Sequence, residues 1–127
     1  MTDLARELET TCIKLENAIV ETIMKGVPPP NAPSTIKRKR SSHTLIDKGN
    51  LVGSITHKII IHGNELQGEV GIFDPEIAYI GFVHEFGRGR NPERSFMRST
   101  FDDKGDQLMD ELEQKIGDQI ARWEILR

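Results

Sequence analysis

The stretch THKIIIHGNELQGEVGIF, residues 56–73, sets the fold class of this chain. Its first part, residues 56–62, is rich in β-branched side chains, and its second part, residues 66–73, largely alternates apolar and polar residues. Between them, His62-Gly63-Asn64-Glu65 has the composition of a tight turn, so the stretch is predicted to be a β-hairpin. A two-stranded hairpin is only marginally stable by itself. We therefore expect at least one further strand, from this chain or from a neighbouring molecule.

On the N-terminal side of the hairpin, residues 2–25 are predicted to form an amphipathic helix. Its apolar residues recur every three or four positions, which places them on one side of a helix. Thr2 suits the position that caps the first turn, and Gly26 suits the position that ends the last one. The predicted buried side consists of Leu4, Leu8, Cys12, Leu15, Ile19 and Ile23.

On the C-terminal side, residues 95–126 are predicted to form a second long helix with two contrasting sides. The predicted apolar side consists of Phe101, Leu108, Leu112, Ile116, Ile120 and Trp123. The opposite side carries Asp118 and a group that we call the acidic face, which consists of Asp102, Asp103, Asp106, Asp110 and Glu113. The acidic face is a candidate contact surface for a positively charged partner.

A short helix is predicted between the hairpin and the second long helix. Asp74 is a favourable N-cap, Pro75 suits the first helical position, and Gly87 suits the end of a helix. The predicted fold class is therefore α+β, with long N-terminal and C-terminal helices packed on a small, mostly antiparallel sheet. A length of 127 residues suits a single domain, residues 1–127.

A proline-rich segment connects the first helix to the hairpin. Residues 28–33, PPPNAP, contain four of the six prolines, and the basic run Lys37, Arg38, Lys39 and Arg40 follows them. Because proline has a fixed φ and no backbone N–H, residues 27–44 are predicted to be an extended basic arm or loop. The basic run fits a solvated arm, a contact with the acidic surface of another subunit, or sequence-independent contact with nucleic-acid phosphates.

The overall composition is that of a globular protein without the basic excess of a typical nucleic-acid-binding domain, since the net charge is -3. Cys12 is the only cysteine, which excludes an intramolecular disulfide and a cysteine-based zinc site, and we expect it to be buried. No apolar run approaches the ~20 residues of a membrane span, and the first residues lack the apolar run of a signal peptide. We expect a protein that is made in a cytoplasm and does not enter a membrane.

His84-Glu85 is the pair that most resembles catalytic chemistry, because a carboxylate often orients a basic imidazole. Neighbouring residues on a helix, however, point about 100° apart. The histidines lack the spacing of a helical metal site, and Gly87-Arg88-Gly89 lacks the preceding strand and the Lys-Ser/Thr ending of a phosphate loop. We therefore expect no enzymatic activity, no cofactor, no metal ion and no small-molecule substrate.

The segment HEFGRGRNPERSFM, residues 84–97, is predicted to be a contact surface, because arginine, phenylalanine and methionine are enriched in interfaces. The alternative is an ordinary loop in which Phe96 and Met97 pack beneath the following helix. The residues that we predict to contact another subunit or partner are Lys37, Arg38, Lys39, Arg40, His84, Glu85, Phe86, Arg88, Arg90, Arg94, Phe96 and Met97.

Four motifs follow one another in a distinctive order. Ala32-Pro33-Ser34-Thr35 precedes LIDKGNL at 45–51 with Ser54-Ile55, and these precede Tyr79 with HEFG at 84–87 and then PERSFM at 92–97. In this order and spacing, over about residues 30–101, they resemble the tail-completion family of tailed bacteriophages, also described as neck or virion-morphogenesis proteins. The chain departs from the usual family pattern at Lys48, Ile80, Glu93 and Ser95.

The resemblance implies a structural virion protein of the phage neck, located at the head–tail junction after synthesis in the host bacterial cytoplasm. Such proteins form a ring, commonly a hexamer, between the head-side connector or head-closure protein and the tail-terminator or tail-tube protein. DNA passes through the ring without specific binding, and the acidic face would line that channel or contact a partner. The alternatives are a tail-terminator or head-closure subunit, or a small nucleic-acid-binding protein that uses Lys37 to Arg40.

Overall fold

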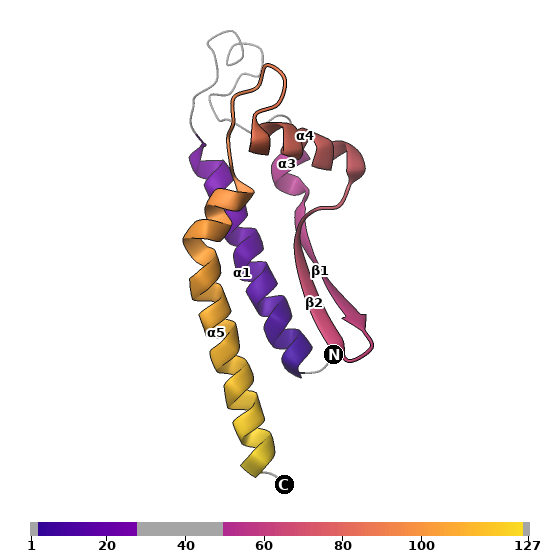
Figure 1. Ribbon diagram of the computed structural model, residues 1–127, viewed down its shortest axis with the longest axis vertical. Coiled ribbons are helices and arrows are strands. Elements are labelled where there is room, and N and C mark those ends of the chain that lie inside the picture. Colours follow the sequence, from indigo (N-terminus) through magenta and orange to yellow (C-terminus); the bar gives the residue numbers. More distant parts are fainter. Residues whose placement is uncertain (1–2, 28–49, 126–127) are drawn as a thin grey trace.

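The two long helices lie side by side and the hairpin packs against one of them, as a computed structural model of the chain shows (Figure 1). The structure describes residues 3–27 and 50–125, with the side chains of residues 3–27 and 51–122. In chain order the elements are α1 (Asp3–Lys25), α3 (Asn50–Gly53), β1 (Ile55–His62), β2 (Glu65–Ile72), α4 (Pro75–Phe86) and α5 (Met97–Ile125). The predicted α+β class is confirmed. The predicted arm, beyond Val27, lies outside the described residues.

α1 is the central element, because α5 packs along one side of it and the hairpin along another (Figure 1). Cys12, Ile19 and Ile23 are buried, and the other three residues of the predicted apolar side are partly buried. The predicted buried side of this helix is therefore confirmed. α5 runs antiparallel to α1, and the hydroxyls of Thr22 and Thr100 lie 2.6 Å apart where the two helices meet.

The predicted hairpin is confirmed, with β1 and β2 antiparallel and Ile55 paired with Ile72 at the base. Gly63 has a φ of 62° in the turn, a left-handed conformation that glycine adopts without strain. The hairpin approaches α1 closely, because a Cβ built on Gly68 would lie 2.5 Å from Cys12 Sγ. Within the described residues the sheet has these two strands alone, so the further strand that the sequence predicts is not found there.

The core lies where α1, α3, the base of the hairpin and the start of α5 meet. It is built from Ile19, Ile23, Leu51, Ile55 and Phe96, of which Ile23 and Phe96 are fully buried. Residues that are far apart in the sequence therefore form one apolar cluster, and their burial is the main stabilising contribution to the fold.

Cys12 is buried between α1 and β2, as predicted. Its burial raises the pKa of the thiol, and the negative charges of Glu9 and Glu16 raise it further. The thiolate is therefore disfavoured, and the residue acts as a small apolar side chain.

The predicted apolar side of α5 is wrong at two positions. Phe101 is 56% exposed and Ile120 is 44% exposed, whereas Thr100, Leu112 and Gln119 are buried. The reason is the way in which α5 packs on α1. Thr100 and Gln119 lie on the side of α5 that faces inward, and apolar spacing alone does not identify that side.

Candidate functional site

α4 begins and ends where the sequence predicts. The side chain of Asp74 accepts hydrogen bonds from the backbone N–H groups of Glu76, at 3.0 Å, and Ile77, at 3.3 Å. At the other end Gly87 adopts the left-handed conformation, with φ 64° and ψ 57°, and its N–H bonds to the carbonyl of Val83. The chain then reverses so tightly that a Cβ on Gly87 would lie 2.6 Å from the backbone nitrogen of Glu93. This reversal returns the chain to the end of α4.

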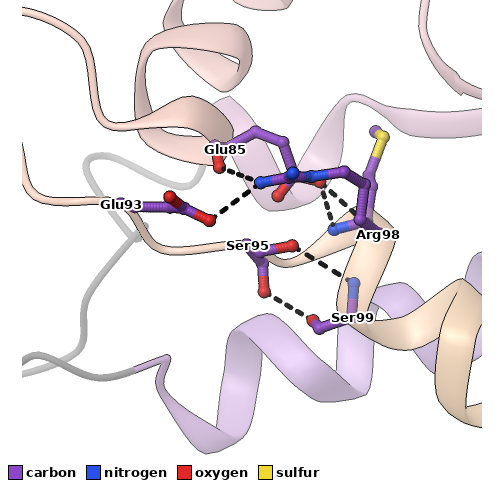
Figure 2. Close-up of polar contacts among 6 residues, drawn as sticks. Glu85, Glu93, Ser95, Arg98 and Ser99 are labelled. Atoms are coloured by element: carbon purple, nitrogen blue, oxygen red, sulfur yellow. Dashed lines mark hydrogen bonds and ion pairs between the residues drawn. The ribbon is translucent and has the colours of Figure 1, made fainter.

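The end of α4 and the start of α5 are joined by the carboxylate of Glu85 (Figure 2). Its Oε1 accepts hydrogen bonds from the backbone N–H groups of Met97, at 3.0 Å, and Arg98, at 2.8 Å. The backbone N–H of Arg94 also bonds to the carbonyl of His84, at 2.8 Å. Glu85 therefore satisfies two of the N–H groups that the first turn of α5 leaves without a partner inside the helix.

Charge and burial both make this contact strong. The first turn of a helix carries a partial positive charge, which a carboxylate stabilises. Glu85 is only 5% exposed, so water competes little for the bonds. Its second oxygen, Oε2, is also buried and accepts no hydrogen bond from any residue that the structure describes. The sequence predicts a contact surface in segment 84–97 but does not reveal that Glu85 caps α5. The hydrogen bonds of this cap form only because the chain reverses at Gly87.

Arg98 makes further contacts at the solvent-exposed side of this junction, by which we mean the contact between the end of α4 and the start of α5. Its Nη2 donates to the carbonyl of Glu85, at 2.9 Å, and to Oε1 of Glu93, at 3.0 Å (Figure 2). Its guanidinium lies 4.4 Å from the centre of the Phe86 ring. Arg98 was not predicted as a contact residue. It connects the end of α4, the loop and the start of α5.

Several predicted contact residues lie inside the molecule. Phe96 is 1% exposed and belongs to the core, in agreement with the alternative in which it packs beneath the following helix. Arg94 is buried, and the loss of solvent around it lowers the pKa of its guanidinium. Together with Glu85, these residues hold the junction together, and their side chains offer little surface to another molecule.

The remaining predicted contact residues lie at the surface or outside the described residues. Phe86, Arg88 and Arg90 are exposed, whereas His84 and Met97 are partly buried. His84 and Glu85 point to different places, since His84 lines a surface depression with Tyr79 and Glu85 bonds to α5. The basic run from Lys37 to Arg40 lies outside the described residues.

α4 presents an apolar surface of which only Phe86 is predicted from the sequence as a contact residue. Its Tyr79, Ile80, Phe82 and Phe86 are all large and exposed, and Tyr79 reaches 68%. The rings of Phe82 and Phe86 lie 5.0 Å apart, and the guanidinium of Arg88 lies 5.7 Å from the Phe82 ring. We call these four residues the α4 surface. The signal for it is the density of large apolar residues in a helix of 12 residues, which is more than one side of a short helix can bury.

A small apolar pocket lies beneath the α4 surface, between α4 and α5. It has a volume of about 220 Å³ and is lined by Phe82, Phe86, Phe96 and Met97, among others. This volume is below the roughly 300–1,000 Å³ of a typical small-molecule site. It is the size of a single large side chain, which suits an anchor residue of a protein partner.

The acidic face is exposed along its whole length. Asp102, Asp103, Asp106, Asp110 and Glu113 all lie at the surface of α5, on turns that follow the junction. Asp103 pairs with Lys104 at 3.7 Å. In residues 3–27 and 50–125, no group of three or more His, Cys, Asp or Glu side chains could hold a metal ion. In the same residues, no helix is long and apolar enough to cross a membrane.

The fold and its junction thus define a small α+β protein with an exposed apolar helix and a separate acidic helix face. No family model, no curated protein and no solved structure matches the chain.

Proposed function

We propose that this chain is a structural subunit of a tailed-phage neck, in a ring that joins the connector of the DNA-filled head to the tail. The ordered motifs over residues 30–101 carry the proposal. Their described residues are not scattered over the fold. Leu51 and Ile55 from one motif pack with Phe96 from another in the same core, and the HEFG and PERSFM motifs are joined by the backbone bond between Arg94 and His84.

The exposed surfaces suit a subunit of an assembly. Contiguous apolar surface on a soluble protein commonly marks a contact with another protein, and the α4 surface combines aromatic side chains with Arg88 in the way that interface centres do. The acidic face is exposed and rich in negative charge, so it repels DNA phosphates and fits either the wall of a DNA channel or a contact with a positively charged surface.

The proposal includes no catalytic step. The His84–Glu85 pair is the strongest catalytic candidate in the sequence, but the two side chains do not face each other. His84 lines a surface depression, whereas Glu85 bonds to the first turn of α5. Because Glu85 uses its Oε1 to cap α5, it is unsuited to orient an imidazole on the same helix. A structural role accounts for Glu85 without any reaction.

The experiment that tests the proposal is a stop codon early in the gene for this chain, within the genome that encodes it, followed by electron microscopy of the particles produced. We expect full heads and finished tails that fail to join, and joined particles when the chain is supplied from a plasmid. Infectious, joined particles in the absence of the chain would contradict the proposal, as would the loss of heads or of tails themselves.

A further inference from the structure

The α4 surface has more apolar area than this chain covers. A helix that is apolar around its whole circumference is normally buried, yet only Gly81 and Glu85 of α4 are buried here. Tyr79, Phe82 and Phe86 remain exposed. The occupant of this surface must therefore bring apolar side chains of its own.

The occupant must also bring negative charge, because arginines lie around the α4 surface. Arg88 lies over Phe82 and Arg98 over Phe86. Arg90 is exposed in the loop that directly follows α4. Glu93 neutralises Arg98, so the positive edge consists mainly of Arg88 and Arg90.

α5 carries a complementary strip on its exposed side. Residues 102, 106, 109, 113 and 120 lie near one line along the helix, since 18 residues make five full turns. These are Asp102, Asp106, Met109, Glu113 and Ile120, and we call them the α5 strip. Met109 is 48% exposed and Ile120 is 44% exposed, so the strip places apolar side chains between carboxylates.

The carboxylates of the α5 strip are available for an external contact. The ion pairs formed within the described residues use other carboxylates of α5, namely Asp103 with Lys104 and Glu111 with Lys14. The lengths also agree, because the α4 surface from Tyr79 to Phe86 and the section of the strip from Asp106 to Glu113 each extend about 10 Å at a helical rise of 1.5 Å per residue.

The two surfaces cannot meet within one molecule in this fold. Only the start of α5, at Arg98, reaches α4. The α5 strip then continues along α1 and away from α4, which lies above the base of the hairpin (Figure 1). A contact between two different surfaces of identical copies is a head-to-tail contact, and such contacts close into a ring when the rotation between copies permits.

We infer that the α4 surface of one copy packs on the α5 strip of a second copy, with Met109 among its aromatic rings and Arg88 and Arg90 against the carboxylates of Asp106 and Glu113. This inference rests on the proposed ring and specifies its subunit contact. It assigns the strip to a neighbouring subunit rather than to the DNA channel. Apolar burial supplies the affinity, and the charges set the pairing and its orientation.

Charge reversal in the full-length chain tests the contact. Arg88→Glu with Arg90→Glu makes both surfaces negative, and Asp106→Arg with Glu113→Arg makes both positive. Each double variant should associate with itself at least about a hundredfold more weakly than the wild type, because like charges then face each other. The measurement is the mass of the assembly by native mass spectrometry and sedimentation, over a range of concentrations.

The rescue is the more specific readout. A chain with all four substitutions should associate with itself again, and a mixture of the two double variants should form complexes that contain equal numbers of each. Arg6→Glu with Lys58→Glu is the matched control for the arginine reversal, because it lowers the net charge equally at exposed positions outside both surfaces. Circular dichroism and melting temperatures show whether each variant is folded.

Three outcomes would overturn the inference. They are association that neither reversal weakens, weakening by both reversals without rescue in the combined variant, and a wild type that stays monomeric at every concentration. Unchanged self-association together with failed head–tail joining would assign the α4 surface to a different neck protein. The neck proposal itself is judged separately, by the particles made without the chain.

Discussion

α1 and α4 arrange their apolar residues in opposite ways. In α1 these residues lie mainly on one side, and that side is buried against α5, the hairpin and the start of α3. In α4 they surround the helix, and the four residues of the α4 surface remain exposed. The comparison teaches that the apolar residues of α1 stabilise the fold, whereas those of α4 exceed what one chain can bury. The second group can contribute free energy only when another molecule covers it.

The comparison is tested most strongly by identical substitutions in the core and on the surface. Phe96→Ala should lower the free energy of unfolding by about 4 kcal/mol, because it removes a fully buried ring and leaves a cavity in the core. Urea denaturation monitored by circular dichroism measures this loss. If the loss is too large for the variant to fold, Phe96→Leu should fold with a smaller loss in the same direction.

Phe101→Ala is the matched control for the core substitution. Phe101 lies in α5, five residues after Phe96, but it is mostly exposed. Its replacement should change the free energy of unfolding by less than about 1 kcal/mol. Equal losses for Phe96 and Phe101 would contradict the assignment of the core to the start of α5.

The junction between the two regions should show the next largest effect. Glu85→Ala should lower the free energy of unfolding by about 2 kcal/mol, because the N–H groups of Met97 and Arg98 lose their buried acceptor. Glu85→Gln keeps an oxygen in place and loses the charge beside the helix end, so its loss should be about 1 kcal/mol.

The order of the two variants is the useful readout. If the cap accounts for the effect, Glu85→Gln lies between the wild type and Glu85→Ala, and amide hydrogen exchange becomes faster in the first turn of α5 in the Ala variant. A Gln variant as unstable as the Ala variant would show that the charge, and not the hydrogen bonds, carries the contribution.

Local signals explain how much of this fold could be predicted. The turn at residues 62–65, the cap at Asp74 and the stop at Gly87 depend on neighbouring residues alone, and the structure confirms each of them. The buried side of α1 was also predictable, because its apolar residues recur at helical spacing.

Tertiary contacts explain what could not be predicted. Phe101 fits an apolar spacing and is exposed, while Thr100 is polar and buried, because the packing of α5 on α1 determines which side faces inward. Segment 84–97 is predicted from the sequence to be a contact surface. Whether a residue of this segment is buried, like Glu85, or exposed, like Arg88, follows from the reversal at Gly87. The spacing of residues in the sequence does not show which of these side chains point inward.

The exposed side of α4 should matter little for the stability of a single chain. Tyr79→Ser with Phe82→Ser should lower the free energy of unfolding by only about 1 kcal/mol when the chain is dilute and monomeric, because both side chains are largely exposed. The same variant should bind less of a dye that fluoresces on apolar surface, and it should lose self-association. A large loss of stability in the dilute chain would show that the α4 surface belongs to the fold, which would remove the contrast with α1.

The smallest expected effect concerns the ion pair between Lys14 of α1 and Glu111 of α5, whose Nζ and Oε2 lie 3.1 Å apart. The hydrogen bond from Lys14 and its positive charge hold the pKa of Glu111 below the ordinary value of 4.5. Since the folded-state pKa is the lower one, the pair stabilises the folded chain above the unfolded pKa. That contribution is lost as the pH falls through the folded pKa.

Melting temperatures of the wild type and Glu111→Gln, compared from neutral pH to about pH 2, isolate this contribution. The wild type should melt at a slightly higher temperature near neutral pH, and the difference should vanish in acid, where Glu111 is protonated. High salt should also reduce the difference, because both side chains are exposed to solvent. A difference that persists unchanged at acid pH would mean that Glu111 acts through packing, and that the ion pair does not join the two long helices.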